Sequence, residues 1–397
     1  MHRFLTILLA ALLLAPQPAA AQESLLARHL EAALSLDAGF RALEAQRAAV
    51  AARGAAVRTP IAGSPSLGGS FRSDTRGPNQ QYEFDAEVAA PVWLPGQRGA
   101  LRGTVESAVS EVEQRLALRR LEVAGLLRDA WWNAAEARRA AQLARERLTT
   151  AREIERDVAR RARLGDIPPT EALLARNETL GAEVALTQAD AEAAAAEAAY
   201  RTLTGGLAPN LPPESVRPRA QAGPHPVLRA GEAALATAEA RQRLVAATPR
   251  DNPELGFFGR QEGGSTTTEA TSLGIRLRVP LATEARNLPR RAEAESEITR
   301  ATAELAQSRR QVEAAIARAQ AQLRAAEATA RVARERLRVA REQEAIALAA
   351  FRAGETGAFD LFRVRQLRLD AANEEGRAAV EALRARSLVN QALGILP

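Results

Sequence analysis

Polar and apolar residues alternate in two short segments of the chain. The first segment runs from residue 82 to 88, and the second from 272 to 279. The apolar series are Tyr82, Phe84, Ala86 and Val88 in the first and Leu273, Ile275, Leu277 and Val279 in the second; the charged residues between them are Glu83, Asp85, Glu87, Arg276 and Arg278. A period of two is typical of a β-strand with one apolar and one polar face. Each segment follows a weaker strand candidate across a polar loop, which predicts β-hairpins over about residues 66–92 and 254–281.

Long segments without proline follow both hairpins, over about residues 96–164 and 290–353. In the first of them, valine and leucine recur at the three- and four-residue steps of a coiled coil, at Val105, Val109, Val112, Leu116 and Val123. At roughly 1.5 Å per residue, such a helix is on the order of 100 Å long. A glycine breaks each segment, and second helices are predicted over about residues 169–203 and 358–392. A further helical stretch, about residues 24–57, precedes the first hairpin.

The order of these elements occurs twice. The stretches "LARERLTTARE" at 143–153 and "VARERLRVARE" at 332–342 share Ala-Arg-Glu-Arg-Leu and then Ala-Arg-Glu in register. We interpret the chain as a tandem duplication of a helix-hairpin-helix-helix unit, over residues 22–206 and 227–397. The segment between them, 207–226, is rich in proline and is predicted to be a linker. The fold class is therefore mainly α with a small β part.

The first residues have the pattern of a secretory signal peptide. Arg3 precedes an apolar run, and small residues stand at Ala19 and Ala21, so we expect cleavage after residue 21. All basic residues are arginine, with a predicted pI of 10.8. The arginines alternate with glutamates along the helical stretches, which favours a solvated, ion-paired helix surface over nucleic-acid binding. No later segment approaches the roughly 18 apolar residues of a membrane-spanning helix.

If the mature protein contacts a membrane, it must therefore do so with its strands. Strands with one apolar and one charged face are the units of outer-membrane barrels, in which the charged face lines water. Glu83, Asp85, Glu87, Arg276 and Arg278 are the predicted lumen residues. Four strands are too few to close a barrel, because the smallest bacterial barrels have about eight. We expect several copies to share one barrel. The alternative is a soluble periplasmic protein that carries two hairpins on its surface.

The chain resembles the TolC-like outer membrane efflux proteins, the exit ducts of tripartite export systems. The resemblance covers nearly the whole mature chain. It rests on the duplicated element order, on "NPELG" at 252–256 before the third strand, on "APVWLPGQRGALR" at 90–102 before the long helix, and on the Arg-x-Gly breaks at 163–165 and 352–354. It implies a homotrimer with a twelve-stranded barrel in the bacterial outer membrane and a long α-helical coiled-coil barrel extending into the periplasm. The implied partners are outer-membrane lipid, a periplasmic adaptor (membrane fusion) protein and an inner-membrane pump.

The resemblance also assigns residues to the far end of the helical tunnel. An adaptor would dock at a tip formed around Arg163, Gly165, Arg352 and Gly354. Asp360 matches the family's aspartate that projects into the pore constriction, and Glu171 is its counterpart in the first unit. Both acids stand in the first turn of a predicted helix, where a carboxylate also complements the helix dipole. The family often has a second acid three residues later, but this chain has Arg363 there.

The sequence has no catalytic constellation. After removal of the signal peptide, His29 and His225 are the remaining histidines, there is no cysteine, and there is no glycine-rich phosphate loop. We therefore expect no enzyme activity, no metal site and no cofactor, but passive conduction coupled to a pump. Two alternatives remain: a channel of an ATP-driven protein secretion system, and a periplasmic coiled-coil scaffold without a channel. The sequence leaves open whether the substrate is a metal cation, a drug, another small molecule or a protein.

Overall fold

The computed structural model describes residues 25–77, 80–219, 222–265, 268–353 and 355–397. The expected signal peptide, residues 1–21, lies outside these ranges, as does Gly354. The elements in chain order are α1 Leu25–Leu36, α2 Ala38–Ala52, α3 Gly54–Arg58, β1 Ser66–Ser73, β2 Gln81–Pro91, α4 Gln97–Leu164, α5 Pro169–Thr204, α6 Pro226–Ala247, β3 Glu254–Gly264, β4 Ala270–Arg278, α7 Glu284–Ala353 and α8 Ala358–Ala392.

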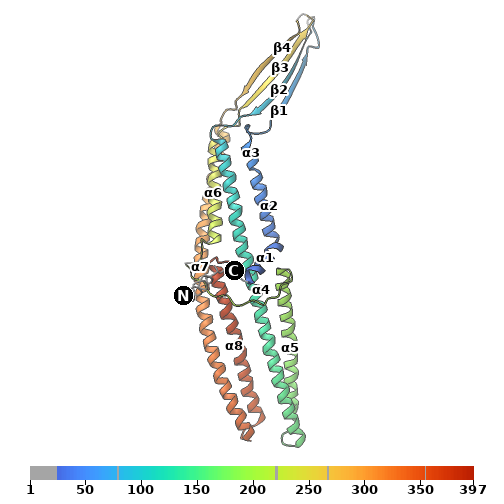
Figure 1. Cartoon of the computed structure of the whole chain (residues 1–397), viewed down its shortest axis with the longest axis vertical. Coiled ribbons are helices and arrows are strands. Elements are labelled where there is room, and N and C mark those ends of the chain that lie inside the picture. Colours follow the sequence, from blue (N-terminus) through green and yellow to red (C-terminus); the bar gives the residue numbers. More distant parts are fainter. Residues whose placement is uncertain (1–24, 78–79, 220–221, 266–267, 354) are drawn as a thin grey trace, which may run out of the picture.

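The molecule is a long rod with the sheet at one end (Figure 1). The helices α4 and α7, of 68 and 70 residues, run from the sheet to the opposite end, about 100 Å at 1.5 Å per residue. In the half next to the sheet, α6 packs against both α4 and α7, and α2 packs against α4. In the other half, α4 pairs with α5 and α7 pairs with α8. Two antiparallel helix pairs therefore form the end of the rod remote from the sheet.

The four strands form one antiparallel sheet in the order β1-β2-β3-β4. The two hairpins come from different halves of the chain and are joined through β2 and β3, with Val88 opposite Phe257 and Asp85 opposite Arg260. This order places β1 and β4 at the two edges of the sheet. An edge strand has backbone N–H and C=O groups on one side that pair with no other strand of its own sheet.

Glycine ends the first long helix as the sequence predicts. Gly165 has φ +83°, in the left-handed region, and its N–H bonds to the carbonyls of Ala162 and Arg161. This is the usual C-terminal cap, because glycine adopts that conformation without steric cost. Pro169 then opens α5 at a position where the missing N–H has no helical partner to lose.

The stretch expected to be helical at about residues 24–57 is helical but does not form the single helix that we predicted. It is divided into α1, α2 and α3, with breaks at Asp37 and Arg53. The Asp37 carboxylate accepts a hydrogen bond from Phe40 N at 2.6 Å and so caps α2. It also accepts bonds from Nε and Nη2 of Arg119 at 2.9 and 2.8 Å. The Arg119 guanidinium holds the pKa of Asp37 below its usual value.

The second long helix also begins earlier than expected. The proline-free segment after Pro289 predicts a start near residue 290, but α7 begins at Glu284 and includes that proline. The N–H groups of Arg286 and Asn287 bond to the carbonyl of Thr283 and start the helix. Pro289 lies near this end of the helix, so it interrupts only one of the first helical hydrogen bonds. Proline alone was therefore a poor marker of this boundary.

A compact apolar core lies near the middle of the rod, where α1, α4 and α5 meet. We call it the central core; its buried members are Leu26, Leu30, Ala33, Leu34, Val123, Ala124, Leu127, Trp131, Trp132 and Tyr200. Its members Tyr200 and Trp132 form side-chain hydrogen bonds. His29 Nδ1 lies 2.7 Å from the Tyr200 hydroxyl, and Trp132 Nε1 donates to Ser387 Oγ of α8 at 3.0 Å. The core therefore joins elements from both repeats.

Arg128 fixes the linker to this core. Its side chain is 1% exposed, and its Nε and Nη2 donate to the Glu214 carboxylate at 2.9 and 2.8 Å. Its Nη1 donates to Gln391 Oε1 at 2.5 Å and its Nη2 to the Ile395 carbonyl at 3.2 Å. The predicted linker 207–226 is accordingly not a free tether at this point, because Glu214 is held against α4 and the end of α8.

Across the described part of the chain, no helix combines the length and the apolar character that crossing a membrane requires.

Candidate functional site

One face of the sheet is apolar and exposed. Exposed side chains on it include Leu67 of β1 at 82%, Phe257 of β3 at 61%, and Leu273 of β4 at 88%. The strand register places these residues on the same face as the series Phe71, Phe84, Ala86, Val88, Leu255, Ile275 and Leu277. The period-two pattern of the sequence therefore corresponds to one continuous apolar surface across all four strands.

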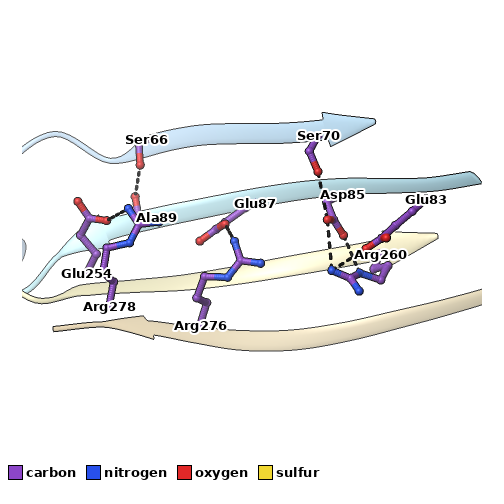
Figure 2. Close-up of polar contacts among 10 residues, drawn as sticks. All are labelled: Ser66, Ser70, Glu83, Asp85, Glu87, Ala89, Glu254, Arg260, Arg276 and Arg278. Carbon is purple, nitrogen blue, oxygen red and sulfur yellow. Dashed lines mark hydrogen bonds and ion pairs between the residues drawn. The ribbon is translucent and has the colours of Figure 1, made fainter. Parts of the chain in front are cut away.

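The opposite face carries Glu83, Asp85 and Glu87 of β2, which we predicted to line the lumen. Each of them is paired with an arginine (Figure 2). Arg260 of β3 donates from Nε to Asp85 Oδ1 at 2.9 Å, and its Nη2 lies 2.7 Å from Glu83 Oε1. Ser70 of β1 donates to the other oxygen of Asp85 at 3.2 Å. Glu87 forms an ion pair with Arg276 of β4.

The pair between Glu87 and Arg276 crosses over strand β3, which separates their own strands. The space for it comes from Gly256, where an added Cβ would lie 2.6 Å from Glu87 Oε1. The guanidinium of Arg276 lies 4.9 Å from the ring centroid of Phe258, which supports it from β3. Arg278 contacts Glu254 of β3 at 3.2 Å. The predicted residues Arg276 and Arg278 thus lie on the same face as the acids of β2.

Sequence reasoning missed Arg260, although it has the densest contacts on this face. The reason lies in β3, where the adjacent aromatic residues Phe257 and Phe258 hide the alternation. The structure places Phe257 on the apolar face and Phe258 on the polar face below Arg276. A signal was present, because a two-residue step from Phe258 reaches Arg260.

The end of the rod remote from the sheet is formed by the end of α4, the start of α5, the end of α7 and the start of α8 (Figure 1), and the described gate and tip residues belong to these helix ends. Glu171 is half-buried in the first turn of α5, and Asp360 is exposed in the first turn of α8. Arg163 and Arg352 are exposed in the last turns of α4 and α7, and Gly165 ends α4. The two acids therefore occupy equivalent positions in the two helix pairs.

Two further features lie between the helix pairs near this end. The guanidinium of Arg161 lies 4.1 Å above the centroid of the Phe351 ring, which links α4 to α7. A groove of about 500 Å³ separates α8 from α4 and α5, with Ile154, Leu174, Phe362 and Arg363 among its lining residues. The arginine that stands in place of a second acid therefore lines this groove.

The two histidines have structural contacts. His29 pairs with Tyr200 in the central core, and burial and the nearby Arg28 lower its pKa. His225, near the end of the predicted linker, caps α6 by accepting a hydrogen bond from Val227 N at 3.2 Å, and burial lowers its pKa. Among the described residues, no group of three or more His, Cys, Asp or Glu side chains is arranged to hold a metal ion.

No family model matches the sequence, and no curated protein matches it significantly. Solved structures match it over nearly its whole length. The outer membrane protein VceC of Vibrio cholerae is 15% identical, with 94% of this chain and 96% of that chain covered and a TM-score of 0.75. The CmeC outer membrane channel of Campylobacter jejuni is also 15% identical, with 93% and 85% covered and a TM-score of 0.73.

The open state of the MtrE outer membrane channel of Neisseria gonorrhoeae is 17% identical, with 93% and 89% covered and a TM-score of 0.70. This chain has the TolC-like fold. The expected resemblance is confirmed at the level of fold, and so is a mainly α architecture with a small sheet. In this chain, the sheet holds the predicted lumen residues, and the helix ends remote from the sheet hold the described gate and tip residues.

Proposed function

We propose that the chain is the outer-membrane exit duct of a tripartite efflux system, which passively conducts substrates received from an inner-membrane pump through a periplasmic adaptor. The observation that carries the proposal is the sheet, with one exposed apolar face, one charged face and two open edges. The apolar face would contact lipid, where an arginine at mid-depth costs about 2–4 kcal/mol. The charged face would line water.

The open edges require further copies of the chain. A strand edge inside a membrane must be paired, because lipid offers no hydrogen bonds to the backbone. In our proposal, β1 of one copy pairs with β4 of the next, a head-to-tail contact that closes into a ring. Three copies make a twelve-stranded barrel in the outer membrane. The paired helices extend into the periplasm, and their tips, around Arg163, Gly165, Arg352 and Gly354, contact the adaptor.

The orientation of the sheet is tested by cysteine labelling, for which the absence of native cysteine provides a clean background. Single cysteines at positions 83, 85 and 87 are expected to react with a water-soluble maleimide in intact outer membranes. Cysteines at positions 84, 86 and 88 are expected to resist it but to be accessible to a lipid-soluble probe, because successive side chains point to opposite faces. Detergent-unfolded samples give the control for full reactivity. The reverse pattern would invert the assignment of the two faces.

A gate role for Asp360 is tested by permeability. In the trimer, three Asp360 carboxylates would converge on the symmetry axis and narrow the passage, with Glu171 as a weaker contributor. We expect Asp360→Ala to make cells more sensitive to bulky antibiotics that normally cross the outer membrane slowly, and Glu171→Ala to have a smaller effect. Glu355→Ala is the matched control, because it removes an exposed acid of the α7–α8 connection. Unchanged permeability with normal assembly of the Asp360 variant would contradict this role.

A further inference from the structure

We propose that Arg260 and Arg276 set the ion selectivity of the strand section by cancelling the acidic charge of its polar face. The inference rests on the proposed function, since it takes this face as the wall of the lumen. Small cations and anions would then pass this section with little preference. The residues concerned come from both repeats, and the contacts between them are those drawn in Figure 2.

Arg260 is the first neutralising residue. It contacts the carboxylates of both Glu83 and Asp85 from the neighbouring strand. The register also places Glu262 directly opposite Glu83, so two like charges meet on this face. Like charges directly opposite each other are destabilising unless a cation lies nearby. Removal of the Arg260 guanidinium would leave a local cluster of uncompensated carboxylates.

Arg276 is the second neutralising residue, and its position depends on two residues of β3. Gly256 leaves the space through which Glu87 reaches across the strand, and Phe258 supports the guanidinium of Arg276 at 4.9 Å. The guanidinium of Arg276 on β4 thereby reaches the carboxylate of Glu87 on β2. A lysine or a shorter side chain would lack the planar guanidinium that stacks on the ring.

The charges of the whole polar face nearly balance. The arginines on it are Arg72, Arg260, Arg276 and Arg278, and the acids are Glu83, Asp85, Glu87, Glu254 and Glu262. A closely paired cation and anion have a weaker field at a distance than either charge alone. Dissolved salt screens the electric field that remains, with a Debye length of about 10 Å at 0.1 M and about 30 Å at 0.01 M. Selectivity changes caused by unpaired charges should therefore be clearest in dilute salt.

The experiment measures the reversal potential of the full assembly in a planar bilayer under a gradient of dilute potassium chloride. We expect Arg260→Gln and Arg276→Gln each to raise the ratio of potassium to chloride permeability by roughly two-fold or more over that of the unsubstituted protein, because each removes one positive charge per chain from a wall within the Debye length of the passing ions. Glu87→Gln should shift the ratio toward chloride. The double variant Arg260→Gln/Asp85→Asn should return to the original ratio.

Ser272→Ala is the matched control, since Ser272 lies opposite Arg260 on the same face and carries no charge. It should leave the ratio unchanged. If all arginine variants form conducting pores with the same ratio of potassium to chloride permeability as the unsubstituted protein, the inference is wrong. The proposed duct function would still stand. A failure of the unsubstituted protein to conduct at all would instead contradict the proposed function. Since the pairs are partly exposed and such pairs stabilise a fold only slightly, the variants should still assemble.

Discussion

Leu273→Arg is expected to remove most of the protein from the outer membrane, whereas Ser272→Arg should leave it there. The two residues are neighbours on β4, but their side chains lie on opposite faces of the sheet. Leu273 is 88% exposed on the apolar face. An arginine facing lipid costs about 2–4 kcal/mol at mid-depth, and a trimer would carry three of them. The measurement is the amount of assembled protein in purified outer membranes.

Comparing Leu273→Arg with Ser272→Arg shows whether a loss of assembly comes from contact with lipid or from a general inability of β4 to accept arginine. The new side chain in Ser272→Arg would extend toward the lumen and remain hydrated, so assembly should be close to that of the unsubstituted protein. Equal loss of both variants would show that β4 does not tolerate the larger side chain on either face. Equal retention of both would show that the apolar face is not in contact with lipid.

Arg128→Met is expected to destabilise the middle of the rod by about 3–5 kcal/mol, the usual effect of removing one partner of a buried ion pair. The side chains of Arg128 and Glu214 are 1% and 13% exposed, so Glu214 would be left almost buried without its cation. Gln391 and the Ile395 carbonyl would lose a donor as well. We expect a lower melting temperature in detergent and faster tryptic cleavage in the linker after Arg219.

Arg120→Met provides the control for this prediction. Arg120 lies on the same helix and pairs with Glu31, but their side chains are 38% and 55% exposed. Exposed pairs of this kind contribute about 0–1 kcal/mol, so the melting temperature should change little. A similar small effect of both variants would mean that Arg128 does not hold the linker to the central core.

The periodicity of the sequence was sufficient to predict the architecture. Alternation in two segments predicted amphipathic strands, and long proline-free segments bounded by glycine predicted helices close to the observed α4, α5 and α8. These predictions succeed because side-chain burial on one face imposes a period on the sequence. The likeness of the two repeats then supplied the order of the elements, since each half supports the interpretation of the other.

Side-chain contacts between distant segments were harder to predict from the sequence than the helices and strands. The break at Asp37 follows from a single capping side chain that also binds Arg119, which is distant in sequence. Arg260 was missed because Phe257 and Phe258 hide the alternation of β3, and its acidic partners lie on a strand of the other repeat. The central core was not predicted either. The contacts of Arg128 bring together α4, the linker and the end of α8, and only the three-dimensional structure places these segments side by side.

The central claim is that several chains share one barrel because a single sheet of four strands has two open edges. The most direct test is the mass of the native protein extracted from outer membranes in mild detergent, measured by native mass spectrometry or light scattering with the detergent contribution subtracted. Our account predicts a particle of three chains whose assembly is lost when the edge strand β1 is disrupted. A stable single chain in the same detergent would contradict it.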